Sequence, residues 1–330
     1  MIYVLCPGNF KSGGPELLHQ LVYQLNILKP KSAKIAYFDY SSKEHPYNPE
    51  LVDYIKDNWI LIEDIKDSSD NIIVFPEMNV DKLKLFKHSQ KYISSIRVDN
   101  FLYTNKFRDM KKYGGLIHAI SWKIKRRGYN KDNLVRNADL HLCQSYYAID
   151  FLKKMNIKTS KIKYLSDYIN DQYLKNSSEA LKKAKKDVVL YNPKKGLKFT
   201  KKLIQASDDL KWEPLINLTN EEVLDKLEHS KVYVDFGNHP GKDRFPREAV
   251  TCGCCVITDK KGSAKFKEDV FIGDEYKFAD TDKNIPYIVK KIKDCILNYS
   301  ERSKDFNEYR ERIAKEKQQF ISDCNNIFIN

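Results

Sequence analysis

The chain has 330 residues and a formal net charge of +13, and this length suggests two domains of ordinary size. Apolar residues make up 42% of the sequence, which excludes a disordered protein, and no apolar run is long enough for a membrane-spanning helix. The N-terminus lacks the basic segment of a signal peptide, and the seven cysteines lack a disulfide spacing. We therefore predict a reduced, cytoplasmic protein, and a peripheral contact at the inner face of an anionic membrane stays open.

Short apolar runs alternate with amphipathic segments in the first half of the chain, a pattern typical of a parallel sheet covered by helices. We predict strands at Ile2–Leu5, Lys34–Phe38, Ile72–Phe75, Tyr92–Ile96, Leu140–Cys143 and Ile162–Leu165, and helices at Pro15–Leu28 and Tyr146–Met155.

A second series of the same kind follows the polar stretch Asn176–Lys186. We predict its strands at Val188–Tyr191, Trp212–Ile216, Val232–Phe236 and Cys255–Thr258. Helices are expected after the turn 193–196, from the capping box Thr219–Glu222, at Pro246–Cys252 and after Pro286. The sequence therefore predicts two α/β halves joined near residues 166–186.

The turn between the first strand and the first helix contains Gly13, Gly14 and Pro15. It is not a Walker A loop, because Gly14 and Pro15 stand where that motif needs a lysine and a hydroxyl, and the Gly-x-Gly-x-x-Gly fingerprint is absent. Two interpretations stay open: the glycine pair lets the backbone approach a bound phosphate, or it forms a plain tight turn.

The most informative stretch runs from Val232 to Thr258 and reads as strand, loop, short helix, glycine turn and buried strand. Its loop carries Lys242, Arg244 and Arg247 within six residues, beside a helix N-terminus, which favours binding of a pyrophosphate over an ordinary surface loop. Glu248, expected in the first helical turn, could accept hydrogen bonds from ribose hydroxyls. His239 in the same loop is a further binding candidate.

Two other clusters favour simpler interpretations. Cys252, Cys254 and Cys255 flank a buried strand and lack a fourth ligand, which favours packing over a metal site. The basic run Lys123–Arg127 fits a solvated helix face better than a contact with an anionic acceptor or lipid. We predict no metal site in the chain.

Three segments together point to a known family. Phe236-Gly237, Glu248-Ala249, Cys252-Gly253 and Val256-Ile257 resemble, in order and spacing, the donor-binding segment of retaining GT-B glycosyltransferases of the family-four type. The Gly13–Glu16 turn resembles that family's Gly-Gly loop, and Asn192–Gly196 resembles its Lys-Gly segment. The family's two glutamates lie eight positions apart, but Pro240 stands at the first position here, and Cys255 replaces the usual proline.

The resemblance implies an α/β protein with two Rossmann-like parallel-sheet domains facing across a cleft. It implies an acceptor-binding domain at 1–166, a nucleotide-sugar-binding domain at 167–300, and a helix at 301–330 that crosses back. The implied catalytic residues are Asp99, at the place of the family's cleft histidine, and Arg244. The implied donor-binding residues are Gly13, Gly14, Lys195, His239, Lys242, Arg244 and Glu248.

The implied reaction moves a sugar from a nucleoside-diphosphate sugar to a glycan or lipid-linked glycan, without metal or cofactor, in surface polysaccharide synthesis. The missing glutamate and the positive charge leave two alternatives open: a non-catalytic module that binds an anionic polymer or nucleic acid, and an enzyme that transfers a phosphate-bearing group or epimerises a sugar nucleotide. The basic runs lack interleaved aromatic residues, so nucleic acid is not the expected partner.

Overall fold

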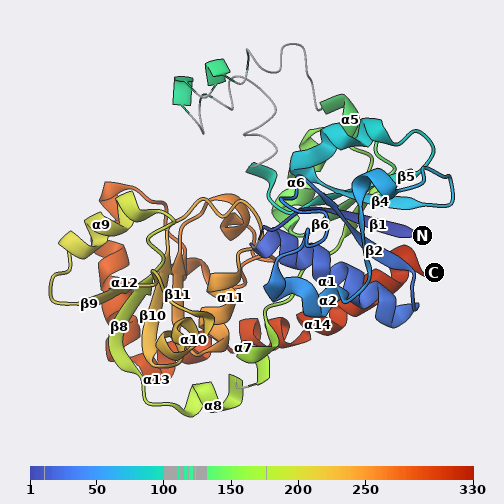
Figure 1. The fold of residues 1–330 in the computed structure, drawn as a ribbon. Helices are drawn as coiled ribbons and strands as arrows, with labels where there is room; N and C mark the ends of the chain where they lie inside the picture. Colours follow the sequence, from blue (N-terminus) through green and yellow to red (C-terminus); the bar gives the residue numbers. More distant parts are fainter. Residues whose placement is uncertain are drawn as a thin grey trace. The chain divides into compact units, whose positions relative to one another are not determined.

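The computed structural model describes residues 1–10, 12–99, 111, 115–117, 119–121, 123, 132–175 and 177–330 (Figure 1). The chain divides into two compact units, Met1–Asp167 together with Gln318–Asn330, and Tyr168–Lys317. The first boundary lies next to the expected one at 166/167. The terminal segment returns to the first unit at Gln318, later than the expected 301.

The first unit is built on a parallel sheet, to which the described residues contribute seven strands in the order β3-β2-β1-β4-β5-β6-β7. These are β1 (Ile2–Pro7), β2 (Ala33–Phe38), β3 (Trp59–Leu61), β4 (Ile72–Pro76), β5 (Gln90–Ser95), β6 (Leu140–Cys143) and β7 (Ile162–Tyr164). The strand order reverses between β1 and β4. In open parallel sheets, ligands bind at such a point, outside the carboxyl ends of the strands.

The α-helices of the first unit include α1 (Gly13–Leu28), α2 (Val52–Ile55), α5 (Asp132–Arg136) and α6 (Tyr146–Lys154). The predicted apolar face of α1 is confirmed, because Leu17, Leu18, Leu21, Val22 and Leu25 are buried. The core on the sheet includes Leu5, Ile73, Phe75 and Ile93, so the strands are held by packed apolar side chains as well as by hydrogen bonds.

The second unit has a parallel sheet of four described strands in the order β11-β10-β8-β9. These are β8 (Lys186–Tyr191), β9 (Lys211–Pro214), β10 (Ser230–Asp235) and β11 (Cys255–Thr258). Its helices are α7 (Asp171–Lys175), α8 (Ser177–Lys182), α9 (Leu197–Gln205), α10 (Asn220–Glu228), α11 (Arg244–Thr251), α12 (Ile285–Leu297) and α13 (Tyr299–Arg302). Here the strand order reverses between β8 and β10.

The predicted capping box at the start of α10 is present. The backbone N–H of Glu222 donates to the Thr219 hydroxyl at 3.2 Å, and the Glu222 carboxylate accepts from the Thr219 backbone N–H at 2.7 Å. This reciprocal pair explains why the helix begins at Asn220.

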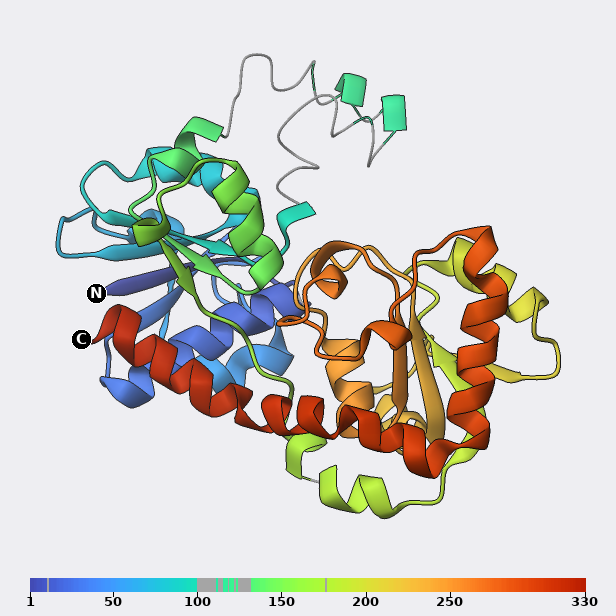
Figure 2. The same cartoon turned by 180° about the vertical axis from the view of Figure 1, so that it is seen from behind.

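The long helix α14 (Asn307–Phe328) begins in the second unit and ends in the first. Its last turns lie beside elements of the first unit (Figure 2), where the rings of Tyr92 and Phe328 are 5.9 Å apart. Among the described helices, none is both long and apolar enough to cross a membrane.

Two of the differences from the sequence prediction, at β3 and α11, have a local reason. The strand β3 was not predicted, because it has only three residues and Trp59 and Ile60 in it are half-buried, so it leaves no clear alternation. The helix α11 begins at Arg244, two residues before the predicted start at Pro246, because Asp243 has the extended conformation of an N-cap residue. A proline in the first turn is compatible with this start.

Candidate functional site

Three loops meet at the carboxyl edge of the second sheet, following β8, β10 and β11. Two glycines allow their close approach. A Cβ at Gly196 would lie 2.1 Å from the carbonyl oxygen of Phe236, and one at Gly262 would lie 2.0 Å from that of His239. Both glycines also have positive φ angles, of 61° and 49°. The Lys195-Gly196 turn is therefore fixed against the loop that follows β10.

His239 lies at the centre of a buried ionic cluster at this edge. Its Nδ1 is 3.0 Å from Asp243, and its Nε2 is 3.7 Å from Asp235 and 3.5 Å from Asp259. Burial alone would lower the pKa of His239, but the three carboxylates outweigh it and raise the pKa to about 9. The imidazole is fully buried and protonated at neutral pH, so it holds the loop instead of facing a ligand.

Lys195, expected to meet donor phosphates, completes the cluster. Its Nζ lies 2.8 Å from Asp243, and its side chain is 26% exposed. Although burial opposes it, the neighbouring Lys195 and His239 hold the pKa of Asp243 well below its usual range. Lys195 is therefore partly exposed at the edge of the sheet, while its ammonium group is paired with the buried Asp243.

Asp235, Asp243 and Asp259 were missed by sequence reasoning. Asp235 ends β10 and Asp259 follows β11, so their position at strand ends was a usable signal.

Asp235, His239 and Asp243 form the one group of potential metal ligands in the described part of the chain whose donor atoms lie within 4.8 Å of one another. The ammonium of Lys195 and the protonated imidazole already supply the positive charge that these carboxylates need. We therefore interpret the group as an ion-pair cluster.

The three cysteines Cys252, Cys254 and Cys255 are all buried. Cys254 donates from Sγ to the carbonyls of Leu227 and Ser230, as expected of packed thiols.

Arg244 and Glu248 lie four residues apart on α11, hence on one face of the helix. Because the helix begins at Arg244, Glu248 lies in the second turn, and its predicted place in the first turn was wrong. Burial raises the pKa of Tyr173 in α7, with Glu248 adding to this effect and Arg244 opposing it. Both site candidates therefore lie near the same buried tyrosine.

Two of the three cations in the predicted basic loop are paired with α14. Lys242 Nζ and Arg247 Nη1 each lie 2.7 Å from a different oxygen of Glu316. The side chain of Arg247 is fully buried and that of Lys242 is 6% exposed. This placement favours a structural role for Lys242 over the expected contact with a donor. Glu316 lies far along the sequence in a helix, so nothing in the loop sequence points to it.

A cavity of about 510 Å³ lies beside this edge, lined by residues that follow β8, β10 and β11, including Gly196, Phe236, Asn238 and Lys261. Asp280 and Asp282 lie on its wall. They pair with Lys261 and Lys202, respectively.

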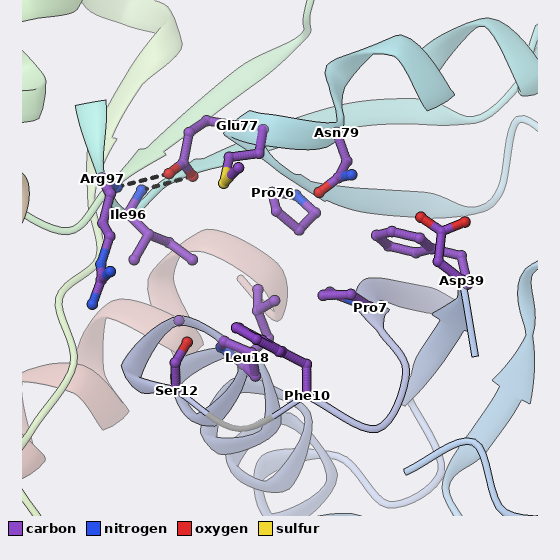
Figure 3. Close-up of a pocket in the computed structure, with 14 residues that line it drawn as sticks. Pro7, Phe10, Ser12, Leu18, Asp39, Pro76, Glu77, Asn79, Ile96 and Arg97 are labelled. Atoms are coloured by element: carbon purple, nitrogen blue, oxygen red, sulfur yellow. Dashed lines mark hydrogen bonds between the residues drawn. The ribbon is translucent and has the colours of Figure 1, made fainter. Parts of the chain in front are cut away.

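The first unit has a cavity of about 430 Å³ at its own carboxyl edge, where the order of strands reverses (Figure 3). Gly14 lines it, together with Ser12 at the start of α1. Gly13 is the first residue of the same helix. The predicted glycine turn is therefore at a cavity, and Lys11 within it lies outside the described residues.

Glu77 follows β4 and braces the loop after β5. Its two carboxylate oxygens accept from the backbone N–H groups of Ile96 at 3.0 Å and Arg97 at 2.8 Å (Figure 3). Burial raises the pKa of Glu77 to about 7, although these hydrogen bonds oppose the shift. Glu77 belongs to no sequence motif. Its position directly after a buried strand is the one sequence signal that could have identified it.

Asp99, the candidate on the same loop, is half-buried and accepts a hydrogen bond from the hydroxyl of Tyr147 at 2.7 Å. It belongs to the first unit, whereas Arg244 and Glu248 belong to the second. Of the basic run Lys123–Arg127, residues 124–127 lie outside the described residues.

No protein-family model matches the sequence, and no curated protein matches it either. Several solved structures match it over nearly the whole length of both chains. HepE from Anabaena, in complex with UDP-glucose, has 10% identity and a TM-score of 0.60, with 99% of each chain covered. Sucrose-phosphate synthase from Thermosynechococcus elongatus has 12% identity and a TM-score of 0.61, with 97% of this chain and 98% of the other covered.

The chain has the GT-B fold. WaaG, a glycosyltransferase involved in lipopolysaccharide biosynthesis, agrees over 100% of both chains, with 10% identity and a TM-score of 0.53. The predicted α/β class and the resemblance to GT-B glycosyltransferases are thereby confirmed. The family-four type and the roles of the individual residues stay predictions.

Proposed function

We propose that the protein is a glycosyltransferase that moves a sugar from a nucleoside-diphosphate sugar to a glycan or lipid-linked glycan, in surface polysaccharide synthesis. The observation that carries the proposal is the agreement of the fold over the full chain with HepE, whose structure contains UDP-glucose. A cavity at the carboxyl edge of each parallel sheet supports it, because ligands bind there in such sheets.

In this proposal the second unit binds the donor. The side chain of Arg244, at the first position of α11, contacts the diphosphate, and the carboxylate of Glu248 accepts from the ribose hydroxyls. Lys195, tethered by Asp243 and partly exposed, adds a second cation. Asp99 in the first unit contacts the acceptor hydroxyl.

The departing nucleoside diphosphate gains negative charge as the sugar bond breaks. Arg244, Lys195 and backbone N–H groups would stabilise this charge in place of a metal ion. We therefore expect transfer to be metal-independent. EDTA should leave turnover unchanged, and a complete loss that Mn²⁺ or Mg²⁺ restores would contradict this part of the proposal.

Donor binding is tested by thermal shift and calorimetry with UDP, GDP, ADP and their sugar conjugates. One nucleoside diphosphate should stabilise the protein by mass action, and Glu248→Gln should weaken its binding by roughly 1–3 kcal/mol. Glu301→Gln is the matched control, because Glu301 is 71% exposed on α13. Equal affinity in Glu248→Gln and the parent would refute the ribose assignment.

Arg244 is tested by its effect on rate. Because its charge meets a phosphate whose charge grows in the transition state, Arg244→Ala should lower turnover more than it weakens donor binding. Lys290→Ala, which removes an exposed cation of α12, is the control. Unchanged turnover in Arg244→Ala would remove this residue from the proposed site.

The alternative is a non-catalytic module that binds nucleic acid or another anionic polymer. It requires that the cations of the basic loop contact the polymer. The pairing of Lys242 and Arg247 with Glu316 argues against this. A salt titration of DNA binding, measured beside UDP and GDP binding, distinguishes the two functions.

A further inference from the structure

The cavity of the first unit is lined by residues that end or follow β1, β2, β4 and β5 (Figure 3). Its volume of about 430 Å³ lies in the range of cavities that hold a small organic ligand. It lies at the reversal of strand order, the usual place for a ligand on such a sheet. Its position therefore marks a binding site, and its walls indicate what kind of group binds.

The walls are mostly apolar. Three prolines, Pro7, Pro15 and Pro76, line the cavity and restrict its backbone. Phe10 is 57% exposed and Met78 is 42% exposed, and both line the same cavity. Large apolar side chains that stay exposed around a hollow are typical of a surface that a ligand covers.

Of the charged groups at the cavity, Glu77 is fully engaged with protein atoms, whereas Asp39 is 72% exposed. Both oxygens of Glu77 hold backbone N–H groups, and the guanidinium of Arg97 extends away from Glu77 (Figure 3). The carboxylate of Asp39 lies 3.7 Å from Lys82. Most of the lining side chains are nevertheless apolar, so a sugar ring buried against them would leave several of its hydroxyls without a partner, which is costly.

We propose that this cavity binds an uncharged apolar group attached to the acceptor, an aliphatic or aromatic aglycone, while the sugar that receives the new bond stays outside it. The inference rests on the proposed function and narrows the acceptor class. It makes the acceptor an amphiphile, whose apolar part is held by the first unit before transfer. Its sugar end then stays outside the cavity and is available for transfer.

The test uses the whole protein and a series of methyl, butyl and hexyl β-D-glucosides, all kept below their micelle concentrations. Binding is measured by calorimetry, and acceptor activity is measured where a donor has been found. Burial predicts that affinity rises with chain length, by up to about fourfold per methylene group. The double variant Phe10→Ser, Met78→Gln should lose most of this dependence.

Leu85→Gln is the matched control. Leu85 lies in the same short helical segment as Met78, Glu77–Leu85, and is 62% exposed, but it does not line the cavity. It should keep the dependence on chain length. Equal affinity for methyl and hexyl glucoside in the parent would overturn the inference, as would a dependence that the double variant keeps.

Nucleoside-diphosphate binding, measured in the same preparations, separates this inference from the proposed function. If nucleotides bind and the alkyl chain has no effect, the aglycone inference fails and the transferase proposal stands. If the alkyl chain increases affinity and no nucleotide binds, the cavity is an apolar binding site and the transferase proposal fails.

Discussion

The carboxyl edges of the two parallel sheets are built on the same topological feature and have opposite chemistry. At the first edge, prolines, Phe10 and Met78 surround a hollow, and the one buried carboxyl group there, among the described residues, is that of Glu77. At the second edge, His239 and Lys195 fill the space beneath the loops together with three aspartates. The cavity at one edge therefore has mostly apolar walls, whereas the other edge has a buried ionic cluster beside its cavity.

This difference follows from the residues that end each strand. Pro7 and Pro76 end β1 and β4 in the first sheet, whereas Asp235 ends β10 and Asp259 follows β11 in the second. Glu77, the buried carboxyl group that follows Pro76, is held by two backbone N–H groups. An aspartate at a buried strand end needs a cation, and the loops of the second unit supply two. The two sheets thus share their topology, and the residues at the strand ends decide how much charge each edge carries.

The largest effect is expected from removing the carboxylate that holds the basic loop of the second unit. Glu316→Ala leaves Arg247 and Lys242 buried without their shared partner. Breaking one side of a buried ion pair typically costs about 3–5 kcal/mol, so the free energy of unfolding in urea should fall by that order.

Glu308→Gln is the control for this variant, because Glu308 pairs with Arg312 on the same helix and is 64% exposed. It should cost less than about 1 kcal/mol. Similar losses in the two variants would mean that the second edge does not depend on buried charge, and the comparison would fail.

A pH titration sharpens the contrast at the second edge. The pKa of His239 is raised from its ordinary value of 6.5 to about 9 in the folded protein. Its contribution is therefore fully present below pH 6.5 and is lost as the pH rises towards 9, by roughly 2–3 kcal/mol. His239→Asn should flatten this part of the stability curve. Asparagine is chosen because His239 has a φ of 44°, which asparagine tolerates. Lys277, whose pKa burial lowers to about 8, titrates in both proteins, so the difference between them isolates His239. A difference that stays constant between pH 6.5 and 9.5 would contradict the assignment.

Periodicity and turn residues were sufficient to predict most strands and helices. The predicted strands Leu140–Cys143 and Cys255–Thr258 are found with the same bounds, because buried parallel strands are short apolar runs between polar turns. The partner of Arg247 could not be predicted in this way. Glu316 lies on a helix with many charged residues, and only the folded chain selects it.

The sequence predicted the site from the number of cations in one loop, and the structure shows which of these cations pair with other residues. Lys242, Arg244 and Arg247 look equivalent in the sequence, but two of them pair with Glu316. Glu77 was not recognised, because an isolated glutamate after a strand has no distinguishing pattern. Its importance comes from two backbone N–H groups that only the neighbouring strand end brings near it.

The smallest effect is expected at the first edge, from Glu77→Gln. The amide keeps one acceptor oxygen, so one of the N–H groups of Ile96 and Arg97 loses its partner, at a cost of about 1–2 kcal/mol near pH 4.5.

The pH dependence of this cost has a definite sign. Because burial raises the pKa of Glu77 from 4.5 to about 7, the folded state holds this proton more tightly than the unfolded state does. The parent therefore loses stability as the pH rises from 4.5 to 7, and the variant lacks that loss. The cost of Glu77→Gln should shrink, and can reverse, between pH 4.5 and 8.

Asp259, whose pKa burial also raises to about 7, titrates in the same range in both proteins, so the difference between them isolates Glu77. Unfolding by urea at several pH values measures this difference. A cost that grows with pH would mean that Glu77 is held as a carboxylate, and the first edge would then be as ionic as the second.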